Sequence, residues 1–522
     1  MGFKVLIPTA GTGSRLGELT QYLNKSLITI ANRPVLSLLV EQFPEDSELV
    51  VALGHKGGLV REFLSIAYPR RNFLFKEVKP FEGPGSGLGL SILFCKEYLQ
   101  EPFIFCSCDT LVEGRIPPPD RNWMGYTKIN DIRPYRTLIL SGDRVSEINE
   151  KGNEKAGAAA YIGLSGIKDY KEFWDLMEAD KEAILMGEVH GMRSLLKKGI
   201  QGVPFIWWDT GNKEALMKTR EKYKLLDSPN ILDKPNEAIW FVGENVIKFS
   251  ADEKFIRDRV ERASRLSGFC PPVSGSTEHM YRYKKIDGRV LSEVVTVPLF
   301  KRFLDFTFSF WKQNNLSPDE KSIFQKNCLS FYKEKTYRRV HQFYETFGVA
   351  DGTEPINGEP MPTLASLLDG LNWEWMSDGL PGRFHGDLHF ENILWSEKTE
   401  KFAFLDWRQN FGGSLAVGDI YYDLAKLLHG LIVCHELIAK GLFKVEWSKN
   451  EIKFNLLRRQ TLLECEDKYE SWLSDQNYDV RKIKILTSLI FLNIAALHHH
   501  PYCLLLYALG KKMLKENARG TK

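Results

Sequence analysis

The sequence predicts an α/β protein with two domains, the first built on a mostly parallel, doubly wound sheet and the second largely helical. Three observations predict this arrangement. Short apolar runs alternate with helical patterns in the N-terminal part, a polar segment with two prolines follows at 222–238, and helical patterns dominate after Val297. At roughly 100–200 residues per domain, 522 residues allow two to four domains.

The N-terminal strands are expected at residues 4–10 (KVLIPTA), 48–53 (ELVVAL) and 103–108 (FIFCSC). The intervening segments VLSLLVEQF, GLVREFLSIAY and GLGLSILFCKEYL have helical patterns. Strands that alternate with helices favour a parallel sheet. Because such sheets bind ligands at the carboxyl ends of their strands, functional residues are expected directly after these runs.

The polar segment 222–238 is the expected domain boundary, which gives domains at 1–225 and 235–522. After it, AIWFVGENVIKFS predicts a hairpin that turns at Gly243-Glu244-Asn245. A helix is expected over EKFIRDRVERASRL, and residues 350–363, rich in Gly, Pro, Asp and Glu, are expected to form an exposed loop.

Composition narrows the range of partners. The chain has 70 basic and 67 acidic residues, a balance that excludes nucleic acid or an anionic membrane as its main partner. Cys106 and Cys108 are expected to serve packing, and the absence of a Cys-x-x-Cys pair argues against a zinc ribbon. The N-terminus does not resemble a signal peptide, and the longest apolar stretches are too short to span a bilayer. We therefore expect a cytoplasmic protein without membrane insertion.

A glycine-rich turn follows the first expected strand. Gly11, Thr12, Gly13 and Ser14 would let the backbone approach a phosphate, with free N–H groups at a following helix start. Arg15 and Lys25 add cations at the same place. The turn lacks the G-x-x-x-x-G-K-[ST] pattern, so a P-loop ATPase is not supported.

The full stretch G-T-G-S-R-L-x(3)-T-x(4)-K resembles the signature of sugar-phosphate and choline-phosphate nucleotidyltransferases. The resemblance implies a Rossmann-like domain that transfers a nucleoside monophosphate onto a phosphorylated substrate and releases pyrophosphate. It also implies that Gly11 and Gly13 hold the nucleotide phosphates, and that Arg15 and Lys25 neutralise them.

Two aspartates match the metal ligands of this family. Asp109 ends the third apolar run, and Asp209 lies in W-W-D-T-G, similar to the family's W-x-D-T-G segment. Carboxylates that hold Mg²⁺ offset the repulsion between two phosphates. Glu150 and Lys151 match less closely a Glu-Lys segment that lies near the acceptor phosphate in the family. Alternatively, these two residues form a surface charge pair. Ser86 and Gly87 lie where the family contacts base and ribose. The sequence departs from the family at LIPTAG and at C-D-T around Asp109.

A second motif begins at residue 385. The segment H-G-D-L-H-F-E-N is followed by F-L-D-W at 404–407, the spacing of a kinase catalytic loop and its metal-binding aspartate. In that chemistry Asp387 accepts the proton of the attacking hydroxyl, and Asn392 and Asp406 hold Mg²⁺ against ATP. His385 is expected to be structural, and His389 is either structural or functional.

The form H-G-D-L-H-x-x-N…D-W resembles the aminoglycoside phosphotransferase and choline kinase family, which implies a bilobal, protein-kinase-like fold and a small-molecule substrate. In the family an aspartate before Leu-Ala braces the catalytic loop, a role open to Asp423 or Asp419. Lys248 matches the nucleotide-clamping lysine. Glu261 is the expected ion-pair partner, since Glu253 lies near the helix start.

Some assignments in this second domain stay open. Met280–Tyr283 is either an adenine-binding hinge, with Tyr281 in contact with nucleotide, or an inner strand. His498, His499 and His500 are expected to form a helix end, because three consecutive histidines cannot face one point on a helix.

Together the two resemblances predict a bifunctional enzyme that uses ATP, Mg²⁺ and a second nucleotide, with CTP as the expected donor. Choline or ethanolamine is one acceptor, with Trp373, Trp375 and Trp407 as candidate cage aromatics. Arg408 stands where choline kinases usually have an acidic residue, which favours an anionic or polyhydroxyl acceptor such as a sugar, polyol or hydroxy acid. One alternative is a sugar kinase fused to a sugar-1-phosphate nucleotidyltransferase. In another, one of the two domains is a non-catalytic nucleotide sensor. Nothing in the sequence selects an oligomeric state.

Overall fold

The computed structural model describes residues 2–153, 155–224 and 234–518. The chain forms two compact units, one of Met1–Ile256 with Ser274–Lys285, and one of Arg257–Val273 with Ile286–Lys522. Most of the expected boundary segment lies outside the described residues. The domain limits 1–225 and 235–522 therefore stay predictions.

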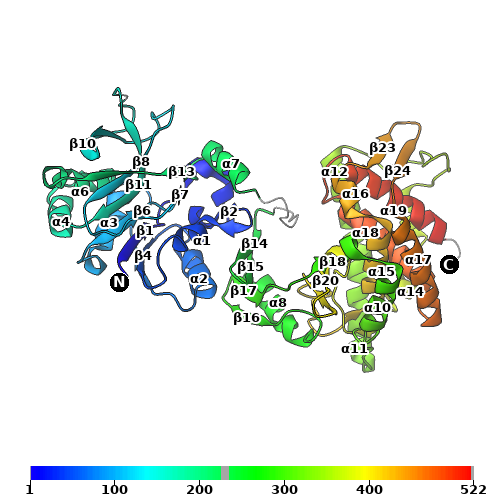
Figure 1. Ribbon diagram of the computed structural model, residues 1–522. Helices are drawn as coiled ribbons and strands as arrows, with labels where there is room; N and C mark the ends of the chain where they lie inside the picture. Colours follow the sequence, from blue (N-terminus) through cyan, green and yellow to red (C-terminus); the bar gives the residue numbers. More distant parts are fainter. Residues whose placement is uncertain (1, 154, 225–233, 519–522) are drawn as a thin grey trace. The chain divides into compact units, whose positions relative to one another are not determined.

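The first unit is built on a mixed sheet with strand order β5-β4-β1-β6-β11-β8-β12-β10-β9 (Figure 1). Strands β5, β4, β1 and β6 are parallel, whereas β11 runs antiparallel to both β6 and β8. The sheet is thus mixed rather than mostly parallel: β5, β4, β1 and β6 form a parallel block, and of the described strands in the other half only β8 and β12 pair in parallel. The strands are β1 (Lys4–Pro8), β4 (Glu48–Leu53), β5 (Phe73–Glu77), β6 (Phe103–Cys106), β8 (Trp123–Thr127), β9 (Thr137–Ser141), β10 (Arg144–Asn149), β11 (Ala159–Ile167) and β12 (Gln201–Pro204).

Both faces of this sheet are covered. Along β1, Val5 and Ile7 pack into one apolar cluster and Leu6 into another, as expected when successive strand residues point to opposite faces. Cys106 and Cys108 are both buried in the first cluster, which confirms that they serve packing. The helices of this unit are α1 (Val35–Val40), α2 (Gly57–Ala67), α3 (Leu88–Phe94), α4 (Tyr170–Ala179), α5 (Ala183–Met186), α6 (Glu188–Ser194) and α7 (Lys213–Lys222).

A smaller sheet of order β14-β15-β17-β16 also belongs to the first unit. The expected hairpin is present as β14 (Glu237–Val242) and β15 (Asn245–Ser250), which are followed by α8 (Glu253–Arg265), β16 (Val273–Ser276) and β17 (Met280–Lys284). Trp240 of β14 is fully buried and meets the ring of Phe63 in α2 edge-on at 5.3 Å. Its indole donates to Thr29 Oγ1 at 3.0 Å. Apolar burial therefore joins this sheet to the N-terminal domain.

The second unit is mainly helical, with α15 (Ile420–Ile432) at its centre. All residues of α15 are buried, and it packs on α17 (Gln460–Asp475) and α18 (Val480–Ala495). The helix therefore lies inside this unit, and its polar residues Asp423, Lys426 and His429 are buried with it. The other helices are α9 (Leu291–Val294), α10 (Val297–Phe308), α11 (Pro318–Leu329), α12 (Lys335–Phe347), α13 (Leu364–Asp369), α14 (Trp373–Ser377), α16 (His435–Ala439) and α19 (Tyr502–Ala518).

Short strands complete the second unit. Order β18-β20-β21 makes one sheet, and β19-β22 and β23-β24 make two pairs. Their bounds are β18 (Arg289–Val290), β19 (Pro381–Gly382), β20 (Ile393–Ser396), β21 (Lys401–Phe404), β22 (Gly418–Asp419), β23 (Phe443–Trp447) and β24 (Ile452–Leu456).

Residues 350–363 lack helix and strand, as expected, but the expectation of exposure was wrong. Ile356 is completely buried and Met361 nearly so, in a cluster with Ile452 and Ala508. The backbone N–H of Ile452 donates to the carbonyl of Pro355. Two apolar side chains among polar ones are enough to dock this loop against β24 and α19.

Two further expectations concern the C-terminal helices. His498, His499 and His500 lie in the turn between α18 and α19, which agrees with a helix end. Within the described ranges, no helix combines the length and apolar character needed to cross a membrane.

Candidate active sites

The glycine-rich turn follows β1 and is built around Gly13. Gly13 has φ +70°, and a Cβ there would lie 2.9 Å from Cβ of Lys25, so only glycine fits. Gly11, Ser14 and Arg15 are exposed and Thr12 is half-buried. The turn therefore presents an accessible backbone beside a cation.

The expected helix start after this turn is absent. Residues Ser14–Thr20 form a 3₁₀ segment (η1) interrupted by Gly17, whose φ and ψ are not helical. Without aligned peptide units there is no macrodipole to attract an anion. The positive charge at this place comes instead from the side chains of Arg15 and Lys25.

Lys25 is held in position by its neighbour Asn24. The buried Asn24 amide donates to the carbonyls of Thr9 and His55, and its oxygen accepts the N–H of Ser26. These bonds start the short 3₁₀ helix Lys25–Leu27 (η2) and direct Lys25 Nζ to Asp109 Oδ2, 3.1 Å away.

The structure brings Asp109 and Asp209 together. Strand β13 (Ile206–Asp209) pairs with β7 (Thr110–Glu113) so that Asp209 stands opposite Thr110. A Cβ built on Gly211 would lie 3.0 Å from Asp109 Oδ2, 3.1 Å from Asp209 Oδ1 and 3.4 Å from Arg15 Nη2. Glycine at 211 therefore keeps a side chain out of the space between the two carboxylates and Arg15.

Neighbouring charges and hydrogen bonds set the pKa values of the Asp109 and Asp209 carboxyl groups. Burial alone would raise the pKa of Asp109, but the Lys25 ammonium and the Ser107 hydroxyl hold it at about 2. Burial and then the charge of Asp109 raise the pKa of Asp209, which accepts from Tyr135 at 3.0 Å. Oxygen donors of this kind are the ligands that Mg²⁺ prefers. Ser107 and Tyr135 carry no sequence signal because their role depends on tertiary contacts.

Glu150 is clamped between two arginines that the sequence did not single out. Arg136 donates to its Oε2 at 3.0 Å and Arg193 to its Oε1 at 2.6 Å. Partial desolvation, followed by the charges of Arg15 and Arg136, lowers the pKa of Lys151. Glu150 therefore holds the side chains of Arg136 and Arg193 in place, and Lys151 adds a positive charge near Arg15.

Ser86 and Gly87 lie in a turn before α3. The Ser86 hydroxyl donates to the carbonyl of Gly83 at 2.7 Å. A Cβ on Gly87 would lie 2.1 Å from the carbonyl oxygen of Ile184. Packing against α5 thus accounts for glycine at 87, whereas Ser86 is half-buried and fixes the turn.

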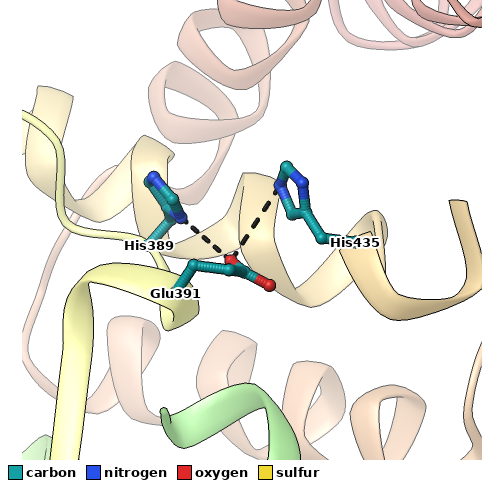
Figure 2. A group of neighbouring side chains, drawn as sticks. All are labelled: His389, Glu391 and His435. Atoms are coloured by element: carbon teal, nitrogen blue, oxygen red, sulfur yellow. Dashed lines mark hydrogen bonds and ion pairs between the residues drawn. The ribbon is translucent and has the colours of Figure 1, made fainter. Parts of the chain in front are cut away.

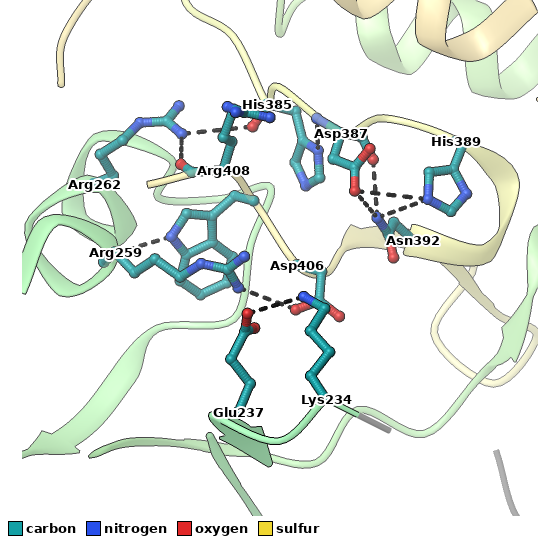
Figure 3. Close-up of polar contacts among 11 residues, drawn as sticks. Lys234, Glu237, Arg259, Arg262, His385, Asp387, His389, Asn392, Asp406 and Arg408 are labelled. Atoms are coloured by element: carbon teal, nitrogen blue, oxygen red, sulfur yellow. Dashed lines mark hydrogen bonds and ion pairs between the residues drawn. The ribbon is translucent and has the colours of Figure 1, made fainter. Parts of the chain in front are cut away.

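The second site surrounds Asp387 (Figure 3). Lys426 of α15 forms an ion pair with Asp387 Oδ1 at 2.8 Å. Asn392 Nδ2 donates to the carbonyl of Asp387 at 2.9 Å and to Oδ2 at 3.4 Å. Burial would raise the pKa of Asp387, but Lys426 and His389 hold it well below its usual range, so the carboxylate stays charged. Lys426 was not predicted, because only the packing of α15 brings it here.

Asp406 follows β21 and lies next to Asn392. Residues 393 and 404 are paired in the β20–β21 ladder, and the N–H of Leu405 donates to the carbonyl of Asn392 at 2.8 Å. Asp406 has φ +56°, a conformation that non-glycine residues rarely adopt outside functional sites. Its Oδ1 meets Arg259 Nη1 at 3.1 Å. The amide nitrogen of Asn392 bonds Asp387, so its oxygen remains for a metal, and the donor set fits Mg²⁺.

The backbone of the catalytic loop is held from two sides. Asp423 accepts the N–H groups of His385 and Gly386, each at 2.6 Å, while Asp419 caps α15. Arg262, 1% exposed, donates to the carbonyls of Phe384, His385 and Arg408. The bracing role thus falls to Asp423.

Histidines gather beside the loop (Figure 2). His385 is buried, and its Nδ1 accepts the N–H of Asp387 at 3.3 Å, a structural contact. Glu391 lies between His389, 2.9 Å away, and His435, 3.9 Å away. His389 Nε2 also approaches Asn392 Nδ2 at 3.2 Å. His389 therefore links the loop to this small cluster.

Lys248, Tyr281 and Glu261, the three residues of this region expected to contact or support the nucleotide, have different surroundings. Lys248 is buried in β15, opposite Tyr281. Tyr281 lies in β17, between β15 and β16, which agrees with the inner-strand alternative for this segment. The geometry does not support Glu261 as an ion-pair partner of a clamping lysine, since its half-exposed carboxylate pairs with Arg265 on the same helix. Glu253 is exposed and pairs with His279.

Arg408 lies directly beside the catalytic loop. Its N–H donates to the carbonyl of His385 at 2.9 Å, and a Cβ on Gly386 would lie 2.6 Å from Cβ of Arg408. Trp407, expected as a cage aromatic, is completely buried and donates to the carbonyl of Arg259. The position of Arg408 agrees with a contact to substrate, whereas Trp407 belongs to the core.

Comparisons with known proteins found a matching family model, curated relatives and similar solved structures. Residues 346–439 match the model of the phosphotransferase enzyme family, a range that holds Asp387, Asn392 and Asp406. Two curated relatives are the bifunctional protein GlmU of Methanocaldococcus jannaschii, 24% identical over 47% of this chain, and that of Methanococcus maripaludis, 21% identical over 36%. The chain spans 60% and 48% of the length of these relatives.

Solved structures similar to this chain include a UDP-glucose pyrophosphorylase complexed with UDP-glucose, at 16% identity and a TM-score of 0.37. The alignment covers 43% of this chain and 98% of that one. The inositol-1-phosphate CTP transferase from T. maritima aligns with 42% of this chain and 96% of its own, at 16% identity and a TM-score of 0.34. Residues 346–439 are therefore similar to the phosphotransferase enzyme family.

Proposed function

We propose that the protein is a bifunctional enzyme with two magnesium-dependent sites. The C-terminal domain, with a bilobal kinase fold, phosphorylates a small hydroxyl compound with ATP. The N-terminal domain transfers a nucleoside monophosphate, CMP from CTP, to that product and releases pyrophosphate. The activated product then serves as a precursor of surface polysaccharide or lipid. The observation that carries this proposal is that each motif found in the sequence gathers its carboxylates at one point in the structure.

In the kinase site, the substrate hydroxyl donates a hydrogen bond to Asp387 and attacks the γ-phosphorus of ATP. The bond from that phosphorus to the β–γ bridging oxygen breaks, ADP leaves, and Asp387 takes the hydroxyl proton. Because Lys426 and His389 lower its pKa, Asp387 is a weak base and acts mainly by orienting the hydroxyl. Asn392 and Asp406 would hold Mg²⁺, which would neutralise charge at the ATP phosphates.

In the nucleotidyltransferase site, an oxygen of the acceptor phosphate attacks the α-phosphorus of the nucleotide, and pyrophosphate leaves. Arg15 and Lys25 bind the phosphates, with Thr12 and Ser14 in the same turn. The arginines around Glu150, together with Lys151, bind the acceptor phosphate. Asp109 and Asp209 would hold Mg²⁺, which would neutralise charge on the reacting phosphates. One of the similar structures is an inositol-1-phosphate CTP transferase, and the reaction in its name is of the type proposed here.

Substitution of each site separately tests the proposal. We expect Asp109→Ala to abolish pyrophosphate release and leave ADP formation intact, and Asp387→Ala to do the reverse. Both activities are measured in the full chain, with circular dichroism as the control for folding. Loss of both activities in either folded variant contradicts the two-site arrangement. Nucleotide binding without turnover over a broad panel of acceptors would identify a non-catalytic domain instead, and turnover of sugars alone would identify a sugar kinase.

A further inference from the structure

The charges around Asp387 are strongly unbalanced. Lys426 of α15 already pairs with this carboxylate at 2.8 Å. Lys335, at the start of α12, and Arg408, after β21, add two further cations. Within the described residues, the ammonium of Lys335 and the guanidinium of Arg408 have no hydrogen-bond or ion-pair partner. Asp387 is paired with Lys426, which leaves Lys335 and Arg408 without a paired counter-charge among the described residues.

Both unpaired cations contact the same aromatic ring. Lys335 Nζ lies 4.2 Å from the centroid of the Phe331 ring, and Arg408 Cζ lies 4.8 Å from it. Lys335 Nζ also lies 5.9 Å from the ring of Tyr422, one helical turn before Lys426. The ring contacts hold these side chains together but neutralise neither charge.

This gathering of cations costs free energy in the isolated protein. Burial, followed by the charges of Arg408, Lys426 and Arg339, lowers the pKa of Lys335 well below its usual range. The Nε of Arg408 is buried and makes no hydrogen bond within the described ranges. Both side chains are half-buried, and half-buried cations gathered without a counter-charge are typical of sites that bind an anion.

A polar side chain in the same region also lacks partners. His429 is 2% exposed, and neither ring nitrogen has a hydrogen-bond partner among the described residues. Burial and then Lys426 lower its pKa well below the usual range, so the ring is neutral. A neutral imidazole offers one donor and one acceptor, which suits a hydroxylated ligand.

The same surroundings do not suit a quaternary ammonium. Trp407 is buried in the core, and Trp375 has Lys482 Nζ 4.7 Å from its ring centroid. Trp373 has Lys333 Nζ 5.9 Å from its ring centroid. The tryptophans expected to form a cage are therefore occupied by the protein's own cations or interior.

We propose that the acceptor of the kinase site carries an anionic group, a carboxylate or a phosphate, bound by Lys335 and Arg408 while its hydroxyl lies against Asp387. This inference rests on the proposed kinase activity at Asp387. It narrows the acceptor to hydroxy acids and phosphorylated alcohols, and it sets aside choline, ethanolamine and neutral polyols.

A panel of matched acceptors tests this in the full chain with Mg²⁺ and ATP. Glycolate, glycerate and glycerol phosphate carry the anion, glycerol and erythritol are neutral, and choline and ethanolamine are cationic. We expect ADP formation with an anionic member, and the comparison of glycerate with glycerol phosphate identifies the anion. Turnover of neutral or cationic members with the anionic ones inert overturns the inference and leaves the kinase proposal standing.

Variants then locate the anion. Lys335→Met should raise the KM for the anionic acceptor about tenfold or more and change the KM for ATP little. Arg338→Met, which removes an exposed cation from the same helix, is the matched control. An equal rise in the KM for ATP, or no rise for the acceptor, would assign the cations to the ATP phosphates and overturn the inference.

Binding measurements cover the case in which no panel member is phosphorylated. Calorimetric titration of glycerate and of inorganic phosphate into the full chain should show binding that Lys335→Met removes and Arg338→Met keeps. That result supports the anion site even without turnover. Absence of both binding and turnover contradicts the anion site and the kinase proposal together.

Discussion

At the scale of single residues, Gly211 shows how the absence of a side chain makes a site. Its missing Cβ is the space between Asp109, Asp209 and Arg15. We predict that Gly211→Ala lowers the nucleotidyltransferase rate about 10-fold to 100-fold, because a methyl group would displace the carboxylates. ADP formation should not change. Gly58→Ala in α2, where a Cβ meets nothing within 4 Å, is the control, and equal losses in both variants would contradict this explanation.

Asp423 is the residue on which the shape of the catalytic loop depends. An asparagine would turn its NH₂ group toward one of the two N–H donors from His385 and Gly386. We predict that Asp423→Asn lowers the free energy of unfolding by about 1–3 kcal/mol and reduces the kinase rate. Chemical denaturation and ADP formation measure the two effects, and an unchanged kinase rate would show that the loop does not need this brace.

The same carboxyl makes stability depend on pH. Burial raises the pKa of Asp423 from 3.8 to about 6. Because the folded state holds the proton more tightly than the unfolded state, this contribution is complete below about pH 4 and is lost as pH rises through 6. The melting temperature of the wild type minus that of Asp423→Asn should therefore be larger at pH 5 than at pH 7. A difference that grows with pH would contradict the assignment.

At the scale of elements, the small sheet β14–β17 packs through an apolar contact on the N-terminal domain. Trp240 is buried against Phe63 and stacks on Phe249 at 5.8 Å. We predict that Trp240→Ala destabilises the first unit by about 3–5 kcal/mol, and Trp240→Phe by less. Urea denaturation, with pyrophosphate release as the readout, measures this loss of stability.

A fragment that ends at residue 224 lacks the sheet β14–β17, which covers α2. We expect this fragment to bind apolar dyes, and a fragment without such binding would contradict the packing argument.

At the scale of the whole molecule, the two carboxylate sites are made by different units and should lose function together only when metal is removed. We predict that EDTA abolishes pyrophosphate release and ADP formation, and that Mg²⁺ restores both. Circular dichroism should stay unchanged, because extensive apolar cores hold both units without metal. Unfolding on chelation would show that a metal has a structural role.

Local motifs account for the part of the site that could be predicted. The strand 48–53, the hairpin around Gly243 and the loop at 385–392 depend on neighbours in the chain, and their positions agree with the structure. The sequence left open whether Tyr281 lies in a hinge or an inner strand, and it did not show that Glu261 pairs with Arg265 on its own helix. Which strand lies inside a sheet, and which helix face is solvated, depends on distant partners.

The sequence by itself determined which groups each motif carries, since spacing within one turn is set by covalent geometry. It placed Asp387 five residues before Asn392, and Lys25 ten residues after Arg15. Only the tertiary structure decided that Asp209 meets Asp109, that Lys426 pairs with Asp387, and that Lys335 and Arg408 share the ring of Phe331. Those distances follow from how strands pair and helices pack, because apolar burial, rather than chain connectivity, brings remote segments together.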